Sequence, residues 1–225
     1  MAARRQRRQS SGFLSNVGLA LVLTTFIFTF AVVLVLNAKW LYYIDITMLN
    51  IDKQSGMTVE NIKANYDTLI LYNQFWYWKE LSFPTLSMSE SGRIHFQEVK
   101  QIFVAVQVLC MTSFVGSVIW IIKKARRGQY GYLKITGLLS LGIPLALGVA
   151  AIWNWDRFFV TFHHVFFRND YWLFDPKTDP VILILPDAYF FHCAVFMLLV
   201  ILLAGSLCLF LARKHRDRVI SRGRR

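Results

Sequence analysis

Four long apolar stretches, residues 13–36, 102–122, 133–153 and 188–212, constrain the fold of this chain more than any other feature. Each holds about 20 or more residues, enough for a helix to cross a hydrocarbon core roughly 30 Å thick. Hydrophobic residues make up 56% of the chain and aromatic residues 16%, which exceeds the needs of a soluble domain. The sequence therefore predicts a mainly α, polytopic membrane protein, one membrane domain over residues 1–225 with four transmembrane helices.

The first apolar stretch also has features of a secretory signal. Four arginines lie within residues 4–8, and residues 36–38 loosely resemble a cleavage site. A signal peptide has a shorter apolar region, of roughly 7–15 residues. We therefore interpret residues 13–36 as a retained membrane anchor.

Basic residues are divided unequally between the segments that flank the apolar stretches. The N-terminal arm, residues 123–134 and the tail 213–225 carry 16 basic residues and one acidic residue, whereas the segments 37–101 and 154–187 carry 9 basic and 12 acidic residues. Lysine and arginine remain in cytoplasmic loops of membrane proteins. This pattern predicts cytoplasmic termini, a cytoplasmic loop at 123–132, a basic cytoplasmic tail at 213–225, and two extracytoplasmic loops at 37–101 and 154–187.

The charge and cysteine patterns exclude several classes of protein. The net charge is +12, but the basic residues adjoin the spans, where anionic lipid headgroups attract them, so nucleic acid is not the expected partner. Cys110, Cys193 and Cys208 all fall within predicted spans, and no disulfide is expected. A long outer loop without a disulfide, in a chain without an Asn-x-Ser/Thr site, favours a bacterial plasma membrane.

The first outer loop has the pattern of a folded segment. Thr58 can cap a helix that continues to about Asn73, and residues 45–50 look extended. The aromatic run 75–78 is typical of a membrane interface and equally of a lipid-binding groove. Residues 81–88 alternate as short strands do, so the loops are predicted to combine short helices with some β-strand.

The second outer loop begins with a predicted amphipathic helix over residues 156–168, on which Phe159, His163, Phe166 and Phe167 share one face. Adjacent helical positions differ by about 100°, so His163 and His164 cannot both point toward the other loop. A turn-rich connector follows, and residues 181–185 are too short to span and are predicted to form a strand.

Two histidines stand in aromatic-flanked outer segments, His95 at the start of the second span and His163 in the amphipathic helix. An imidazole with an ordinary pKa near 6.5 takes or gives a proton at ambient pH. One interfacial histidine is usually structural. Two such residues in separate outer segments favour a functional site.

The sequence resembles the lipoprotein intramolecular transacylases of Gram-positive bacteria over most of its length. The residues that carry the resemblance are Tyr66-Asp67, Leu69-Ile70, Tyr72, His95-Phe96, Val99-Lys100, Phe103, Phe162-His163, Phe166-Phe167, Asn169, Trp172, Asp175-Pro176, Asp179, Pro186 and Phe190. The His-Phe and Phe-His-x-x-Phe-Phe segments are the most specific. The two family histidines correspond to His95 and His163, while His164 occupies a variable position and is a reserve candidate.

The resemblance implies a transfer of the sn-2 acyl chain of a diacylglyceryl lipoprotein onto the α-amino group of its own N-terminal cysteine, giving a lyso-form lipoprotein. The expected partners are this lipoprotein N-terminus and membrane lipids, the site is expected on the extracytoplasmic face, and no cofactor or metal is implied. We expect Tyr72, Asn169 and Trp172 to contact the oxyanion or headgroup, with Asp175 as a further supporting residue.

The side chains available fit this chemistry independently, because the substrate amine attacks the ester directly and no enzyme nucleophile is needed. An α-amino group has a pKa of about 7.7–8.0, so the reaction needs a base for its proton and an acid for the departing glyceryl oxygen. Two histidines can fill both roles, and the sequence does not assign which fills which.

Other functions are weighed against this one. Metal-assisted hydrolysis would use His95, His163 and Asp175 or Asp179, but the chain has no recognised ligand spacing. Serine catalysis lacks a Gly-x-Ser-x-Gly elbow. A transporter would need ionisable residues within the spans. The main alternative is a non-enzymatic adaptor or lipid-binding protein with surface-docking aromatic loops.

Overall fold

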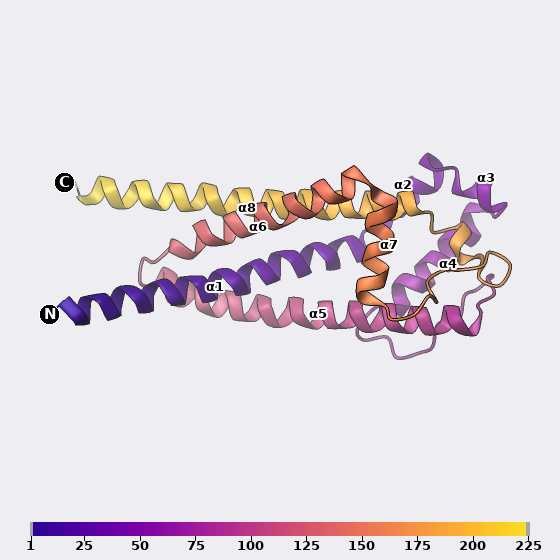
Figure 1. The fold of residues 1–225 in the computed structure, drawn as a ribbon, viewed down its shortest axis with the longest axis horizontal. Helices are drawn as coiled ribbons and strands as arrows, with labels where there is room; N and C mark the ends of the chain where they lie inside the picture. Colours follow the sequence, from indigo (N-terminus) through magenta and orange to yellow (C-terminus); the bar gives the residue numbers. More distant parts are fainter. Residues whose placement is uncertain (1, 224–225) are drawn as a thin grey trace. The chain divides into compact units, whose positions relative to one another are not determined.

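The computed structural model describes residues 2–223, with side chains described except at 2–11, 147, 150–152 and 217–223. Nine helical elements follow one another along this part of the chain (Figure 1): α1 Ala2–Asn37, α2 Lys39–Met48, α3 Ile51–Ser55, α4 Val59–Tyr72, α5 Glu90–Ala125, α6 Gly131–Trp153, α7 Trp155–Phe166, the 3-10 helix η1 Pro180–Leu183, and α8 Asp187–Gly223. The arginines at 4–8 and the basic residues from 218 onward, which carry part of the topology prediction, lie outside the described side chains.

Three helices in the described chain are long and apolar enough to cross a membrane: Gly12–Asn37, Glu90–Ala125 and Asp187–Arg216. The fourth predicted span, 133–153, is helical as α6, in which Gly131–Ala146 forms a shorter apolar segment. The helix contains Pro144, which membrane helices tolerate better than soluble ones. A mainly helical, multi-pass membrane protein is thus confirmed, while the fourth crossing remains a prediction.

The chain divides into two compact units. The first unit contains residues 1–31, 109–148 and 198–225, and the second contains 32–108 and 149–197. In the first unit, α6 and α8 approach closely at glycine. A Cβ atom built on Gly137 would lie 2.6 Å from the Leu209 side chain and 2.9 Å from the Gly205 carbonyl oxygen. Small residues allow this close contact between membrane helices.

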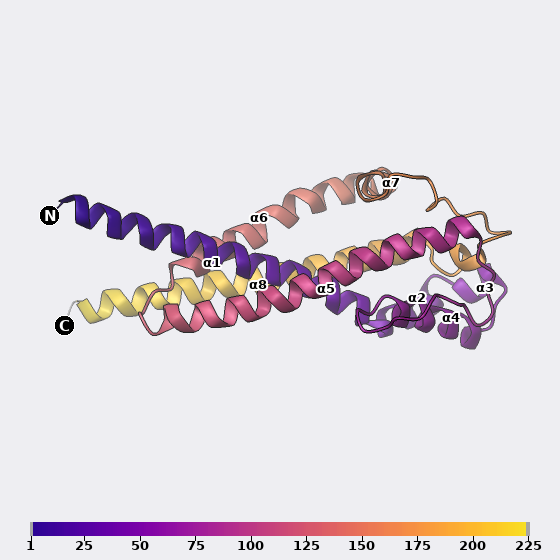
Figure 2. The same cartoon turned by 90° about the horizontal axis from the view of Figure 1, so that it is seen from below.

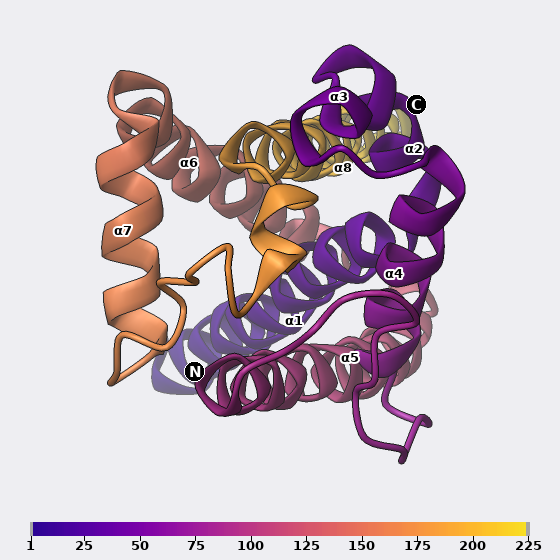
Figure 3. The ribbon, with the colours of Figure 1, turned by 90° about the vertical axis from the view of Figure 1, so that its right-hand side faces the viewer.

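The second unit is built around a core of tyrosines. Tyr42 of α2 stacks on Tyr66 of α4 with ring centroids 3.7 Å apart, and its hydroxyl donates to the Ile184 carbonyl at 2.6 Å. The hydroxyls of Tyr66 and Tyr189 lie 2.7 Å apart. Figure 3 shows the connector from α7 to α8, and Ile184 of this connector and Tyr189 of α8 are buried in the same core. The two predicted outer loops therefore share one core.

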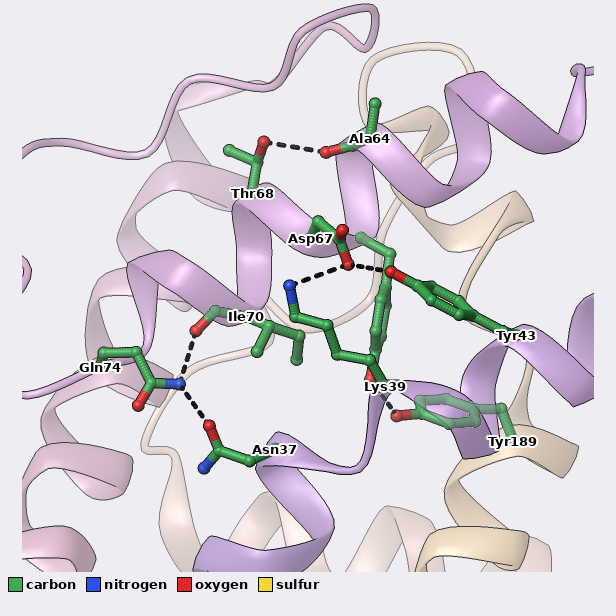
Figure 4. Close-up of polar contacts among 10 residues, drawn as sticks. Asn37, Lys39, Tyr43, Ala64, Asp67, Thr68, Ile70, Gln74 and Tyr189 are labelled. Atoms are coloured by element: carbon green, nitrogen blue, oxygen red, sulfur yellow. Dashed lines mark hydrogen bonds and ion pairs between the residues drawn. The ribbon is translucent and has the colours of Figure 1, made fainter.

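Polar contacts fasten α2 to its neighbours in the second unit. Asp67 of α4 accepts from the Tyr43 hydroxyl at 2.7 Å and lies 3.1 Å from the Lys39 ammonium (Figure 4). On another side, Asp45 is 1% exposed and both of its carboxylate oxygens lie 2.9 Å from His192 Nδ1. A buried carboxylate needs partners of this kind, so α2 is tied to both α4 and α8.

The prediction of β-strand in the loops is wrong, since no residue that the structure describes lies in a strand. Residues 45–48 continue helix α2, because Tyr42, Asp45 and Ile46 are its buried residues at helical spacing. Residues 81–88 are irregular, and there the Asn65 amide bonds Thr85 at both its backbone N–H and its hydroxyl, in place of a neighbouring strand. Residues 181–183 belong to η1, which begins at Pro180.

The helix predicted after Thr58 is confirmed as α4. The Thr58 hydroxyl accepts from the Asn61 backbone N–H at 3.3 Å, as an N-cap does. The predicted helix at 156–168 is also confirmed, with shifted ends, as α7. The cysteines predicted to lie in the spans are free thiols.

Candidate active site

The first turn of α5 is fixed by a residue of the second loop. The Ser89 hydroxyl accepts from the Gly92 backbone N–H at 3.0 Å, and the Asp179 carboxylate accepts from the Ser89 backbone N–H at 2.8 Å. Asp179 is 2% exposed, and its second oxygen accepts from the Thr178 hydroxyl. A Cβ atom on Gly92 would collide with the Asp179 carboxylate, so glycine permits this approach. The helix turn that carries His95 is thereby anchored at its start.

His95 lies in this anchored part of α5 and is only 5% exposed. Three phenylalanine rings surround its imidazole, with centroid distances of 4.7 Å to Phe167, 5.4 Å to Phe174 and 5.8 Å to Phe96. Its buried Nδ1 atom has no hydrogen-bond partner among the residues that the structure describes. Because buried polar atoms are nearly always paired, this nitrogen indicates a functional position.

Helix α7 presents His163 to the same place. Its start is capped by Asn154, whose side-chain oxygen accepts from the Arg157 N–H at 2.9 Å. The axis of α7 runs across that of the N-terminal part of α5 in Figures 1 and 2. The helix ends at Phe166, and the next residue is extended, so Phe167 leaves the helical face predicted for it and is buried against His95. Phe166 is 52% exposed, which also corrects that prediction.

The hydrogen bonding of His163 defines its free nitrogen. Nδ1 lies 2.8 Å from the Phe159 carbonyl oxygen, which only accepts, so Nδ1 carries a proton and Nε2 holds the lone pair of the neutral ring. Burial, the largest effect, lowers the pKa of His163 below its ordinary value. The Phe159 hydrogen bond and the Asp187 carboxylate oppose this effect, and His164 adds to it. A lowered pKa favours the neutral form of the His163 imidazole.

The two imidazoles face one another closely enough to act on one small group. Their centroids are 6.3 Å apart with an interplanar angle of 31°. The indole of Trp172 stacks on His163 at 4.5 Å. This separation lies within the roughly 10 Å that joint action on one ester requires.

A carboxylate and an amide are hydrogen-bonded to each other one helical turn along α5 from His95. The Asn169 side-chain nitrogen donates to Glu98 Oε1 at 2.9 Å. Glu98 follows His95 by three positions on α5, so both lie on one face of the helix. Glu98 Oε2 and Trp172 Nε1 are buried and, like His95 Nδ1, have no hydrogen-bond partner within the described part of the chain. Three such atoms around one imidazole pair mark a site arranged for something other than its own stability.

Four of the sequence-predicted residues come together here: His95, His163, Asn169 and Trp172. His164 is exposed and meets Trp172 only edge-on at 5.6 Å, in agreement with the prediction that adjacent histidines diverge. Glu98 and Phe174 are not among the residues that the sequence predicts for the site. Glu98 could have been predicted, because it follows His95 by about one helical turn and so lies on the same face of the helix.

The contacts described for two further predicted supporting residues are with partners other than the two histidines. Tyr72 is 7% exposed, and the Lys100 ammonium lies 4.1 Å from its ring centroid and donates to the Tyr77 carbonyl at 2.7 Å. Asp175 is exposed and accepts from the Lys177 N–H at 2.9 Å within a turn. These contacts describe packing at Tyr72 and a turn at Asp175, and the substrate-binding roles expected for the two residues remain predictions.

The side chains offer no complete set of metal ligands at the histidine pair. The described residues contain no group of three or more His, Cys, Asp or Glu side chains placed to hold an ion. The third ligand in the metal alternative would be Asp175 or Asp179. Asp175 lies in its turn, and both oxygens of Asp179 already accept hydrogen bonds.

An open hollow of about 400 Å³ lies where α6 meets α7, and it is lined by Trp153, Asn154, Arg157, Phe158 and Thr161. The α7 residues in this lining lie more than about 100° around the helix from His163. The hollow and the imidazole pair therefore occupy different faces of α7.

The fold and the site together define a multi-pass membrane protein with a buried pair of imidazoles. Comparison with known proteins is more specific. The family model of the lipoprotein intramolecular transacylase Lit matches residues 17–190. The structure of the membrane-integral Lit from Bacillus cereus matches with a TM-score of 0.91 and 37% identity, over 95% of this chain and 99% of the other.

Two further structures of the Bacillus cereus protein carry a histidine replaced by arginine or by alanine. Both match with a TM-score of 0.87 and 36% identity, over 98% and 97% of this chain respectively and 99% of the other. No curated protein sequence gives a significant match. The chain belongs to the lipoprotein intramolecular transacylase family, and it is an acyltransferase, as its sequence predicts.

Proposed function

We propose that this enzyme moves the sn-2 acyl chain of a diacylglyceryl lipoprotein onto the α-amino group of the lipoprotein's own N-terminal cysteine, with His95 and His163 as the catalytic pair. The observation that carries the proposal is the distance of 6.3 Å between the ring centroids of His95 and His163. In addition, the buried His95 Nδ1 has no hydrogen-bond partner among the described residues. The lyso-form lipoprotein is the product.

His163 is the base in this proposal. Its Nε2 lone pair is free because Nδ1 is bound to the Phe159 carbonyl. The substrate ammonium has a pKa of about 7.7–8.0, so a neutral imidazole accepts its proton at ambient pH. The amine nitrogen then attacks the sn-2 ester carbonyl carbon and forms a C–N bond, and the carbonyl becomes a tetrahedral oxyanion.

His95 supports the second half of the reaction. An N–H on its buried ring can donate to the oxyanion in surroundings where aromatic rings exclude water, which strengthens such a bond. By this point the first ammonium proton has passed from His163 to water. His163 takes a second proton from the nitrogen of the tetrahedral intermediate, the C–O bond breaks, and the sn-2 glyceryl oxygen takes that proton from the protonated His163. Both imidazoles return to their starting state, and the acyl chain is held as an amide.

The site belongs, in the proposal, on the extracytoplasmic side of a bacterial plasma membrane. The basic residues of segment 123–134 and of the tail support this orientation through the positive-inside rule. A lipoprotein held by its lipid in the outer leaflet would then reach the imidazole pair without leaving the membrane.

The test measures acyl transfer in membranes with a synthetic diacylglyceryl lipopeptide that is isotopically labelled only in its sn-2 chain. Mass spectrometry should find the label on the cysteine nitrogen. His95→Ala and His163→Ala should each reduce the rate by about 10²–10⁴-fold. His215→Ala is the matched control, because His215 lies in the first unit stacked on Tyr130. Full activity in either test variant, or transfer of the unlabelled chain, would overturn the proposal.

A further inference from the structure

We infer that Glu98 binds the α-ammonium group of the substrate and holds it beside the imidazole pair, an inference that rests on the proposed reaction. Glu98 Oε1 is bound to the Asn169 amide, whereas Glu98 Oε2 is buried and has no hydrogen-bond partner among the described side chains and backbone. The carboxylate is thus held in one orientation with one oxygen left to accept a hydrogen bond.

The orientation of the Asn169 amide is itself determined. Its side-chain oxygen accepts from the Tyr171 backbone N–H at 3.1 Å, so its nitrogen faces Glu98. The amide supplies one donor, and it carries no charge that would neutralise the carboxylate. Asn169 is therefore a positioning residue, which orients the Glu98 carboxylate and leaves its charge available.

Cationic side chains near Glu98 on the same helix are engaged elsewhere. Lys100 donates to the Tyr77 carbonyl and lies over the Tyr72 ring. Arg93 pairs with Glu90 at 2.8 Å. A partly buried carboxylate without a cation is costly to the protein, and a substrate cation removes that cost when it binds.

The substrate carries a cation of the right kind. An α-amino group is largely protonated near pH 7, but only its neutral form attacks an ester. The Glu98 carboxylate would bind the ammonium on one side. The His163 lone pair, on the other side, would then remove one proton. Glu98 and His95 share a face of α5, and His95 lies opposite His163, so the bound nitrogen would lie next to its base.

The experiment compares binding of two lipopeptides to the full-length protein in nanodiscs. Both are dialkylglyceryl-cysteinyl peptides, whose ether links cannot transfer a chain. One has a free α-amine and the other is N-acetylated. The wild type should bind the free amine about tenfold or more tightly than the acetylated peptide. Glu98→Gln should bind both peptides equally, and Glu90→Gln, on the exposed side of the same helix, should retain the preference.

Two additional measurements keep the outcomes separate. Glu98→Asp retains the carboxylate and should keep part of the preference, so it tests the inference even if Glu98→Gln fails to fold. Suppose that the wild type forms lyso-lipopeptide and that folded Glu98→Gln still prefers the free-amine peptide over the acetylated one. This result would overturn the role of Glu98 and leave the proposed reaction in place. Suppose instead that the preference for the free amine depends on Glu98 but the wild type forms no lyso product from the ester substrate. This result would overturn the proposed reaction.

Discussion

Each of the two units has its own kind of internal stabilisation. In the first unit, helices meet at small residues such as Gly18, which faces the Trp120 ring, and Gly137, which faces Leu209. In the second unit, individual hydrogen bonds fix tyrosines, Asn65 and Asp179. Packing by shape determines how close helices come, whereas directional bonds determine how a side chain is oriented. The two histidines that we propose as acid and base belong to the second unit, where directional bonds orient the side chains.

The largest expected effect is at the hydrogen bonds of Asp179. Asp179→Ala should lower the free energy of unfolding by about 3 kcal/mol, because the buried Ser89 N–H and Thr178 hydroxyl lose a charged acceptor. Unfolding in denaturing detergent, followed by tryptophan fluorescence, measures the change. Asp175→Ala, in the adjacent exposed turn, should cost less than about 1 kcal/mol. Equal losses in the two variants would mean that directional bonds do not dominate the second unit.

The next effect tests packing in the first unit. Gly137→Ala should lower stability by about 2 kcal/mol, since its Cβ would lie within 2.9 Å of a backbone oxygen as well as the Leu209 side chain. Gly142→Ala meets no atom within 4 Å and should be neutral or stabilising by up to about 1 kcal/mol. Thermal unfolding of the Gly137→Ala and Gly142→Ala variants measures the difference. Similar melting temperatures for the two variants would contradict the role assigned to close helix contact.

A smaller effect is expected at the tyrosine core of the second unit. Tyr66→Phe removes the hydroxyl that bonds Tyr189 and should cost about 1 kcal/mol while the ring stacking on Tyr42 persists. A double-mutant cycle with Tyr189→Phe measures the coupling. Strict additivity of the two single changes would show that this bond contributes nothing to the core.

The smallest effect is in the titration of His163. Its folded-state pKa should lie below the ordinary imidazole value of about 6.5. A histidine with a lowered pKa contributes stability that is present above its unfolded pKa and is lost as pH falls toward the folded value. NMR titration of labelled histidine, assigned with His163→Ala, measures the shift directly. A folded pKa above 6.5 would contradict the neutral base.

Local patterns predicted part of this fold and part of the site. Apolar length predicted the long helices, Thr58 predicted the start of α4, and helical geometry predicted that His163 and His164 diverge. Each of these depends on residues close together in sequence.

Contacts between distant residues account for most of what was missed. Residues 81–88 alternate as a strand does, but the Thr85 backbone N–H donates to the Asn65 side chain and not to a neighbouring strand. Glu98 is separated from its partner Asn169 by 71 positions. Periodicity describes one segment at a time, so it contains no information about which loops will pair.

The bond between Ser89 and Asp179 has a consequence for biosynthesis. It joins residues 90 positions apart, and the turn that presents His95 therefore lacks its anchor until the second loop has been made and folded. A nascent chain emerges from its N-terminus, so His95 waits for a later segment. The enzyme should acquire its reactive arrangement only at the end of synthesis, and truncated chains inserted in the membrane should be unable to modify lipoproteins.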